Sequence, residues 1–266
     1  MDVRLIATDL DGTLFGADHR PAPPTVEAVN AAVDAGIIVV AATGRSWFRG
    51  LELATGTGAR LHQFIGSNGG HRIDVATRTL DERLAFDTDV VHEIIESLSA
   101  ELGNVGFGFE LTDGMSWTER FVELTPVSLD GDRRPPSPSP VDRFDEVGKM
   151  FVVHPEVAEV DLVRLVNPLV PADINVTTSG VPFVELTPPG ADKGTAVARF
   201  AATLGIEAEH VIAFGDNQND LSLLEWAGHS VAMGNALGMV KAVADEVTGT
   251  NLEFGVAQVI NRLIAG

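Results

Sequence analysis

The sequence of 266 residues contains no cysteine and few basic side chains, and both features limit what the protein can be. Without cysteine, disulfides and thiolate metal ligands are excluded. Lysine and arginine together number 18 against 38 aspartates and glutamates, which gives a formal net charge of −20. Such a surface repels nucleic-acid backbones and anionic lipid, so neither is an expected partner. A phosphorylated small molecule would need positive charge gathered at one place.

Long hydrophobic runs are also lacking. The apolar run Ile37–Ala42 is far shorter than the roughly 20 residues that span a bilayer. The first residues lead directly into an apolar strand, with no basic segment and cleavable hydrophobic stretch before it. We therefore expect a cytoplasmic protein without membrane contact, either a monomer or a small homo-oligomer.

Two parts of the chain, residues 1–82 and 188–266, alternate short apolar runs with stretches of helical spacing. This alternation is typical of parallel strands joined by crossover helices, and it predicts an α/β, Rossmann-like fold. Glycines follow some of the helical stretches, where a helix would end. The expected strands are 3–8, 37–43, 61–67, 211–214 and 230–233, and the expected helices are 24–34, 46–54, 195–204 and 219–227.

Residues 83–187 have a different pattern, with more strands and fewer helices. This pattern predicts an α+β unit inserted into the first domain. Its segment Asp132–Pro140, rich in proline, serine and arginine, is an expected exposed loop. The expected helices of the inserted unit are 87–102 and 155–169, and its expected strands are 105–110, 121–124, 149–154, 174–178 and 182–186.

Two carboxylates follow the first expected strand, in the segment Asp9-Leu10-Asp11-Gly12-Thr13. A bend at the glycine would let both turn toward one site. One carboxylate could then attack phosphorus as a nucleophile. The other could protonate the leaving oxygen and later take a proton from water. An Asp-Gly turn that caps a helix is the alternative interpretation.

Two further segments have features of an anion site. Thr43-Gly44-Arg45 combines a hydroxyl with accessible backbone N–H groups at a strand-to-helix turn, next to the positive end of the following helix. Lys193 lies in the first turn of an expected helix, where the macrodipole disfavours a cation. A simple strand end and a solvated lysine remain open as alternatives.

The segment Gly215–Asp220 places two acids and two amides together after an apolar strand. Carboxylates with waters and substrate phosphate are the oxygen ligands that Mg²⁺ prefers. A polar surface loop is the alternative. In an open α/β sheet, ligands bind beyond the carboxyl ends of the strands, and all four segments are expected at such places.

In this order the four segments resemble the four motifs of the haloacid dehalogenase (HAD) superfamily, and they are closest to its Cof-type, sugar-phosphatase-like branch. Ser67-Asn68-Gly69 and two segments near the C-terminus also match. The chain between Asp9 and Thr43 is short, whereas a large insertion separates Thr43 from Lys193. For this family, that arrangement implies a C2-type α/β cap.

The resemblance implies a metal and proton-transfer role for five residues. Asp9 would be the nucleophile and a Mg²⁺ ligand. Asp11 would be the general acid and base, with its backbone carbonyl also on the metal. Asp216 would bind Mg²⁺ directly, while Asn219 and Asp220 would hold the metal's waters and the lysine.

The resemblance also implies a binding site for the phosphoryl group. Thr43, Gly44 and Lys193 would bind its oxygens. Arg45 would contact the phosphate or cap a helix, and Asn68 would contact substrate or serve a turn without a ligand. These two alternatives stay open at this point.

The implied activity is a Mg²⁺-dependent phosphatase that forms an aspartyl-phosphate. Its substrates would be small phosphorylated metabolites such as sugar phosphates, or phosphorylated flavin or pyridoxal compounds, and the insert would act as a lid. A phosphotransferase or mutase on the same scaffold and a non-catalytic sugar-phosphate-binding protein are the alternatives. The seven histidines show no ligand spacing and are assigned to surface or core.

Overall fold

The computed structural model describes residues 2–112, 114–125 and 147–265. The chain divides into two compact units, one formed by Met1–Glu82 with Asp192–Gly266 and the other by Arg83–Ala191. The sequence predicted that the chain returns to the first unit at residue 188, whereas in the structure it returns at Asp192. The predicted loop Asp132–Pro140 lies outside the described residues.

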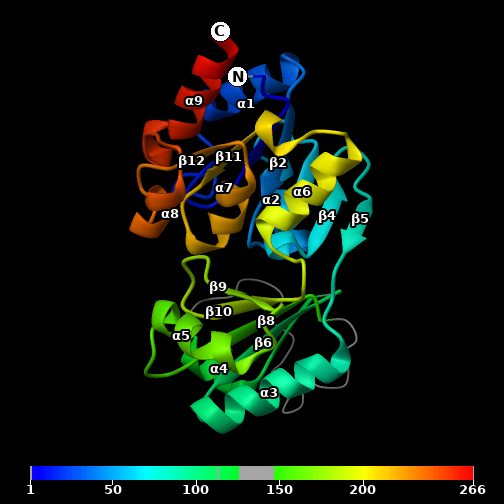
Figure 1. Cartoon of the computed structure of the whole chain (residues 1–266), viewed down its shortest axis with the longest axis vertical. Helices are drawn as coiled ribbons and strands as arrows, with labels where there is room; N and C mark the ends of the chain where they lie inside the picture. The colour runs from blue at the N-terminus through cyan, green and yellow to red at the C-terminus, as the bar shows by residue number, and fades with distance from the viewer. Residues whose placement is uncertain (1, 113, 126–146, 266) are drawn as a thin grey trace. The chain divides into compact units, whose positions relative to one another are not determined.

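A twisted sheet forms the centre of the first unit (Figure 1). Among the described residues its eight strands have the order β13-β12-β11-β1-β2-β3-β4-β5. Pairing is parallel from β13 to β3 and antiparallel between β3 and β4, which confirms the predicted α/β fold. The strands are β1 Leu5–Thr8, β2 Ile38–Ala42, β3 Gln63–Gly66, β4 His71–Asp74, β5 Leu80–Arg83, β11 Val211–Gly215, β12 His229–Ala232 and β13 Glu246–Val247.

Helices cover this sheet and connect its parallel strands. Helix α1 packs on α9, and α6 packs on α7, with α6 and α7 in front of the strands in Figure 1. None of the helices within the described ranges has the length and apolar character needed to cross a membrane. The helices are α1 Pro23–Asp34, α2 Trp47–Thr55, α6 Lys193–Thr203, α7 Leu221–Trp226, α8 Gly238–Val243 and α9 Gly255–Ala265.

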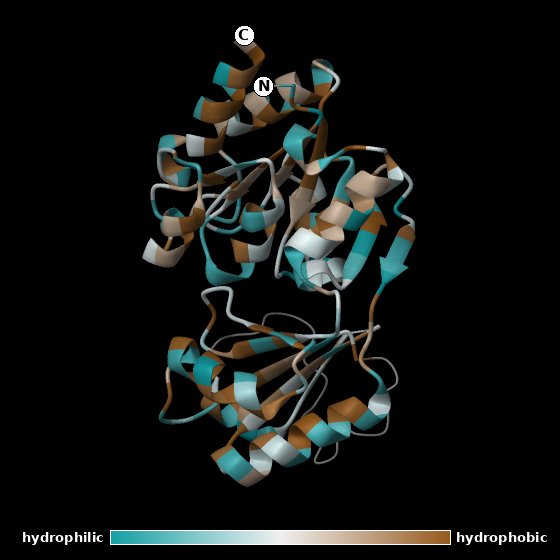
Figure 2. Cartoon of the chain, viewed as in Figure 1, coloured by the Kyte–Doolittle hydropathy of each residue, from teal (hydrophilic) through white to brown (hydrophobic). Residues whose placement is uncertain are grey.

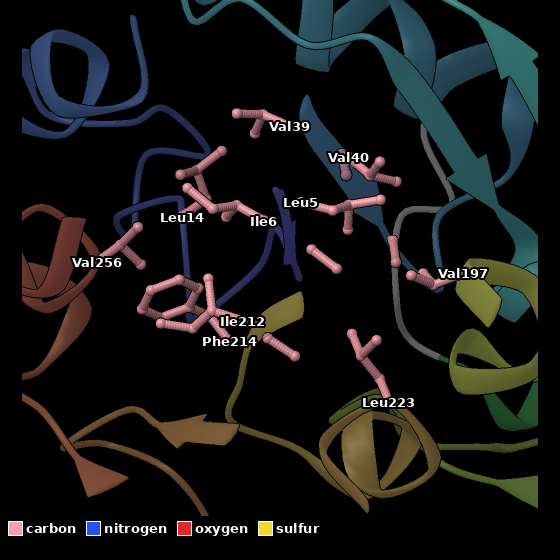
Figure 3. Packing of buried hydrophobic residues seen from close by; sticks show 14 of the residues in the cluster. Leu5, Ile6, Leu14, Val39, Val40, Val197, Ile212, Phe214, Leu223 and Val256 are labelled. Atoms are coloured by element: carbon pink, nitrogen blue, oxygen red, sulfur yellow. The ribbon is translucent and has the colours of Figure 1, made fainter. Parts of the chain in front are cut away.

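The central strands are apolar on both sides because both faces of the sheet are covered. Leu5 and Ile6 are consecutive in β1 and fully buried, and their side chains point to opposite faces. Figure 3 shows Leu5 on the side of Val197 and Leu223, from α6 and α7, and Ile6 on the side of Val256, from α9. This packing holds β1 rigidly between its neighbours β11 and β2.

The second unit contains, within its described residues, a five-stranded sheet with the order β7-β6-β8-β10-β9. The pairs are antiparallel. Figure 2 shows hydrophobic and hydrophilic bands alternating along α3, whose buried side carries Val91, Ile94 and Leu98. The elements are α3 Thr88–Leu102, β6 Gly106–Leu111, β7 Gly114–Trp117, α4 Glu119–Leu124, β8 Lys149–Val153, α5 Glu159–Val166, β9 Asn175–Thr177 and β10 Val184–Thr187.

One prediction for this unit is wrong, since residues 121–124 form a helix and not a strand. The Thr118 side chain caps α4 by accepting a hydrogen bond from the Phe121 N–H. Glu119 lies in the first turn, where the helix dipole favours a negative charge. These local signals outweigh the strand preference of phenylalanine and valine.

Close packing of α6 on α7 predicts that Gly194→Ala destabilises the fold. A Cβ at Gly194 would lie 2.2 Å from the Ser222 carbonyl oxygen, so the two helices would have to separate. We expect a loss of about 1–3 kcal/mol in the free energy of unfolding, measured by urea denaturation. Gly238→Ala is the matched control because a Cβ there meets no atom within 4 Å. Equal stability of the two variants would contradict the packing argument.

Candidate active site

Three neighbouring strands end at the same edge of the first sheet. Thr8, the last residue of β1, pairs with Ala41 of β2 and with Phe214 of β11. The residues that follow these strands, Asp9, Thr43 and Asp216, therefore emerge close together. The backbone N–H of Asp9 donates to the Phe214 carbonyl at 3.0 Å, which holds Asp9 against β11.

Lys193 joins two of the predicted acidic residues. Its Nζ donates to Asp9 Oδ1 at 2.6 Å and to Asp220 Oδ1 at 2.5 Å. Lys193 and Asp220 are fully buried, and Asp9 is 5% exposed. Burial would lower the pKa of Lys193, but the charges of Asp220 and Asp9 outweigh it and raise that pKa above its usual value. The ammonium is thus a fixed positive charge at this edge of the sheet.

The pKa of the buried Asp9 carboxyl is shifted as well. Burial raises the pKa of Asp9 well above its usual value, Lys193 opposes the rise, and the nearby carboxylates Asp220 and Asp216 add to it. A negative charge on Asp9 is therefore unfavourable at this buried site unless cations balance it. A bound cation would complete that balance.

Asp220 uses both of its oxygens within the protein. Oδ1 accepts from Lys193, and Oδ2 accepts from the backbone N–H groups of Asp216 and Asn217 at 2.9 Å each. Asp220 therefore orients the lysine and shapes the turn after β11.

Asp216 is fixed by the loop that follows β1. The Thr13 hydroxyl donates to Asp216 Oδ1 at 2.7 Å. Gly12 has φ +84°, and a Cβ there would lie 2.4 Å from Asp216 Oδ2, so this position requires glycine. Burial, and next the charge of Asp220, raise the pKa of Asp216 to about 6.

The chemistry of this cluster fits a hard divalent cation. Asp9, Asp216 and Asp220 each place a carboxylate oxygen within 4.8 Å of the other two. Among the hydrogen bonds of the described residues, none reaches Asp9 Oδ2 or Asp216 Oδ2. One or two carboxylates with waters and substrate phosphate are what Mg²⁺ takes, so the residues present suit it.

The Asp11 side chain lies outside this three-carboxylate group and is held by two basic residues. Arg45 Nε donates to Asp11 Oδ2 at 2.5 Å, and a second guanidinium nitrogen donates to Oδ1 at 2.6 Å. His19 Nδ1 lies 3.2 Å from Asp11 Oδ1 and 2.9 Å from the guanidinium. The structure thus pairs Arg45 with a carboxylate. The assignment of His19 to surface or core missed this contact.

The predicted phosphate-binding segment begins directly after β2. Thr43 is buried, and its hydroxyl accepts from the Arg45 backbone N–H at 3.2 Å. Its carbonyl accepts from the Asn68 N–H at 3.0 Å. Gly44 follows in the turn that leads to α2. The turn therefore lies beside β1 and Asp9.

Asn68 and Asn219 form a buried pair in the first unit. Asn219 Nδ2 donates to Asn68 Oδ1 at 3.0 Å. Ser67 and Asn68 both adopt the left-handed backbone region, with φ 54° and 55°. Residues in this backbone region are strained and persist only where the surrounding structure holds them. Such residues are concentrated at functional sites. The pair connects the turn after β3 with the acidic segment that contains Asp220.

The chain is similar to known proteins along nearly its whole length. Residues 6–260 match the family model described as haloacid dehalogenase-like hydrolase. The chain is 29% identical to the 5-amino-6-(5-phospho-D-ribitylamino)uracil phosphatase YcsE of Bacillus subtilis, over 99% of this chain and 97% of the relative. It is 28% identical to the pyridoxal phosphate phosphatase YbhA of Escherichia coli, over 98% of each.

A solved structure agrees with these relatives. It is a haloacid dehalogenase-like hydrolase from B. subtilis, with a TM-score of 0.84 and 27% identity over 98% of this chain and 100% of that one. The fold, the four motifs and the family model therefore point the same way, and the predicted phosphatase class is confirmed. The chain belongs to the haloacid dehalogenase-like hydrolase family that its motifs predicted.

Proposed function

We propose that this protein is a Mg²⁺-dependent phosphatase that hydrolyses small phosphorylated metabolites through an aspartyl-phosphate on Asp9. The observation that carries the proposal is the buried Asp9 carboxylate, bonded to Lys193 and grouped with Asp216 and Asp220 within 4.8 Å. The proposed nucleophile, the buried ammonium of Lys193 and the proposed oxygen ligands of the cation thus lie together.

In the first step, an oxygen of Asp9 attacks phosphorus as the bond from phosphorus to the ester oxygen breaks. Asp11 gives its proton to the departing oxygen. To do so, its side chain turns away from Arg45, which holds it in the structure. Thr43, Gly44 and Lys193 bind the phosphoryl oxygens, where fixed positive charge and N–H groups stabilise the transferring group.

In the second step, a water oxygen attacks phosphorus and the bond from phosphorus to Asp9 breaks. Asp11 takes the proton of this water, which restores both aspartates. Asp9, Asp216 and the backbone carbonyl of Asp11 would hold Mg²⁺, with Asn219 and Asp220 around it. When bound, the cation supplies positive charge that offsets the charge on the phosphoryl oxygens.

The relatives and the insertion support the proposed substrate class. The two named relatives are a phosphatase of a ribityl-aminouracil phosphate and one of pyridoxal phosphate. We propose phosphorylated metabolites of this size, with sugar phosphates, as substrates. The second unit, Arg83–Ala191, is proposed as the cap that selects among them.

Replacement of the nucleophile tests the proposal. Asp9→Asn should lower phosphate release by roughly a thousandfold or more, because the amide cannot form the covalent intermediate. Both proteins are assayed in Mg²⁺ with glucose 6-phosphate, pyridoxal phosphate and the ribityl-aminouracil phosphate. Wild type should also carry a phosphoryl group that mass spectrometry detects after rapid quenching.

Asp34→Asn is the control, since Asp34 is an exposed carboxylate paired with Arg60. It should keep full activity. Equal phosphate release by wild type and Asp9→Asn would refute the assigned nucleophile. Transfer of the phosphoryl group to a sugar hydroxyl, without free phosphate, would favour a phosphotransferase.

Cation binding can be measured without turnover. Mg²⁺ at a hundredfold excess over its dissociation constant should stabilise the folded protein by about 2.7 kcal/mol, seen as a rise in thermal midpoint. Asp216→Asn should lose most of this rise, while Asp34→Asn keeps it. Removal of the cation by EDTA should abolish phosphate release. An equal rise in wild type and Asp216→Asn would place the cation elsewhere.

The charge balance at Lys193 has a consequence for stability. Lys193→Met leaves the buried carboxylates Asp9 and Asp220 without their ammonium, which should cost about 3–5 kcal/mol in urea denaturation. Asp220→Asn added to this variant should recover part of the loss. Lys241→Met is the control, because within the described ranges Lys241 donates only to the Gly234 carbonyl. A similar loss for both lysines would contradict the buried-charge argument.

A further inference from the structure

Two asparagines far along the chain hold the loop that follows Asp11. Asn235 Nδ2 donates to the Gly12 carbonyl at 2.8 Å, and Asn251 Nδ2 donates to the Phe15 carbonyl at 2.8 Å. Gly12 is the residue next to Asp11 and has φ +84°. Glycine leaves the backbone unusually free at this position. The Phe15 N–H donates to the Leu10 carbonyl at 2.7 Å within the loop, and the two asparagines add contacts from outside it.

The two asparagines also fix each other. The Asn251 backbone N–H donates to Asn235 Oδ1 at 3.0 Å, so the Asn235 amide nitrogen is directed toward Gly12. Asn251 starts a short turn capped by Thr250 and Glu253, whose side chains each accept from the other's backbone N–H. The loop carbonyls are therefore held by a pre-formed unit.

The segment that contains Asn235 reaches the metal-binding acid as well. The Leu237 N–H donates to the Asp216 carbonyl at 2.9 Å. One short stretch, residues 235–237, thus bonds to the backbone beside Asp11 and to the backbone of Asp216. It sets the place of the proton-transfer group relative to the acidic cluster.

We propose that Asn235 and Asn251 are positioning residues for Asp11, an inference that rests on the proposed phosphatase activity. They touch no reacting atom. They hold the loop backbone so that the Asp11 carboxyl can reach the ester oxygen when the bond from phosphorus to that oxygen breaks. Asp11 then gives its proton to this oxygen, while Asp9 forms the new bond to phosphorus.

This role predicts a dependence on the leaving group that a general structural role would not produce. An alkoxide leaves poorly and needs the proton from Asp11, whereas p-nitrophenolate leaves without it. A misplaced Asp11 therefore slows the first step, which kcat/KM reports, far more for an alkyl ester than for an aryl ester. The second step, in which Asp11 takes a proton from water, is the same for both esters and affects kcat alone. Damage to Asp9 or to the cation site would slow both.

The experiment compares Asn235→Ala, Asn235→Asp and Asn251→Ala with wild type, using glucose 6-phosphate and p-nitrophenyl phosphate. Asn235→Asp keeps the size and the acceptor for Asn251 but cannot donate to Gly12. We expect kcat/KM for glucose 6-phosphate to fall at least about tenfold in each variant, with a smaller effect on kcat/KM for p-nitrophenyl phosphate.

Asn30→Ala is the matched control, since Asn30 also donates its amide to a loop carbonyl, that of Gly58, at 3.1 Å. It should leave both rates unchanged. Thermal midpoints separate misfolding from misplacement, and Asn251→Ala provides a second test if Asn235→Ala does not fold. Equal losses of kcat/KM on both esters, or none, in folded variants of an active wild type would overturn the positioning role alone. A wild type inactive on both esters and on the metabolite panel would overturn the proposed function and this inference together.

Discussion

The ammonium of Lys193, held between Asp9 and Asp220, is the interaction on which the rest of the site depends. Two carboxylates and one ammonium are buried within hydrogen-bonding distance, and removing the ammonium would leave two carboxylates unbalanced away from water. Lys193 lies at the start of α6, where the helix dipole opposes a cation, so the carboxylates and not the helix stabilise it. An arrangement costly to folding is reasonable at a site where a reaction builds up negative charge.

The geometry of the sheet makes this arrangement possible. Strands β11, β1 and β2 are adjacent and parallel, so the residues that follow them meet although they come from distant parts of the chain. Apolar packing on both faces fixes the strands, and the loops carry the chemistry. The loops at this edge are closely packed, since a single Cβ added at Gly12 would collide with Asp216.

Much of this could be predicted from the sequence because the signals are local. Apolar runs mark β1, β2 and β11, and the polar residues after them mark the site. The wrong strand at 121–124 arose because the cap at Thr118, outside that segment, decides the structure. His19, Asn235 and Asn251 were missed because their contacts join segments that no short pattern connects. For Arg45 the sequence left open a contact with phosphate or a helix cap, and no local pattern indicated its contact with the carboxylate of Asp11.

The side chain of Asp11 and the backbone that follows it are held by different residues. Arg45 and His19 hold the carboxyl, and the proposed proton transfer requires that it part from Arg45. Asn235 and Asn251 hold the backbone that follows it, at Gly12 and Phe15. The proposed movement is therefore confined to the side-chain torsions of Asp11 while its Cα stays in place. A short movement from a fixed point is what repeated donation and recovery of one proton demands, since both steps must meet the same phosphorus within hydrogen-bonding reach.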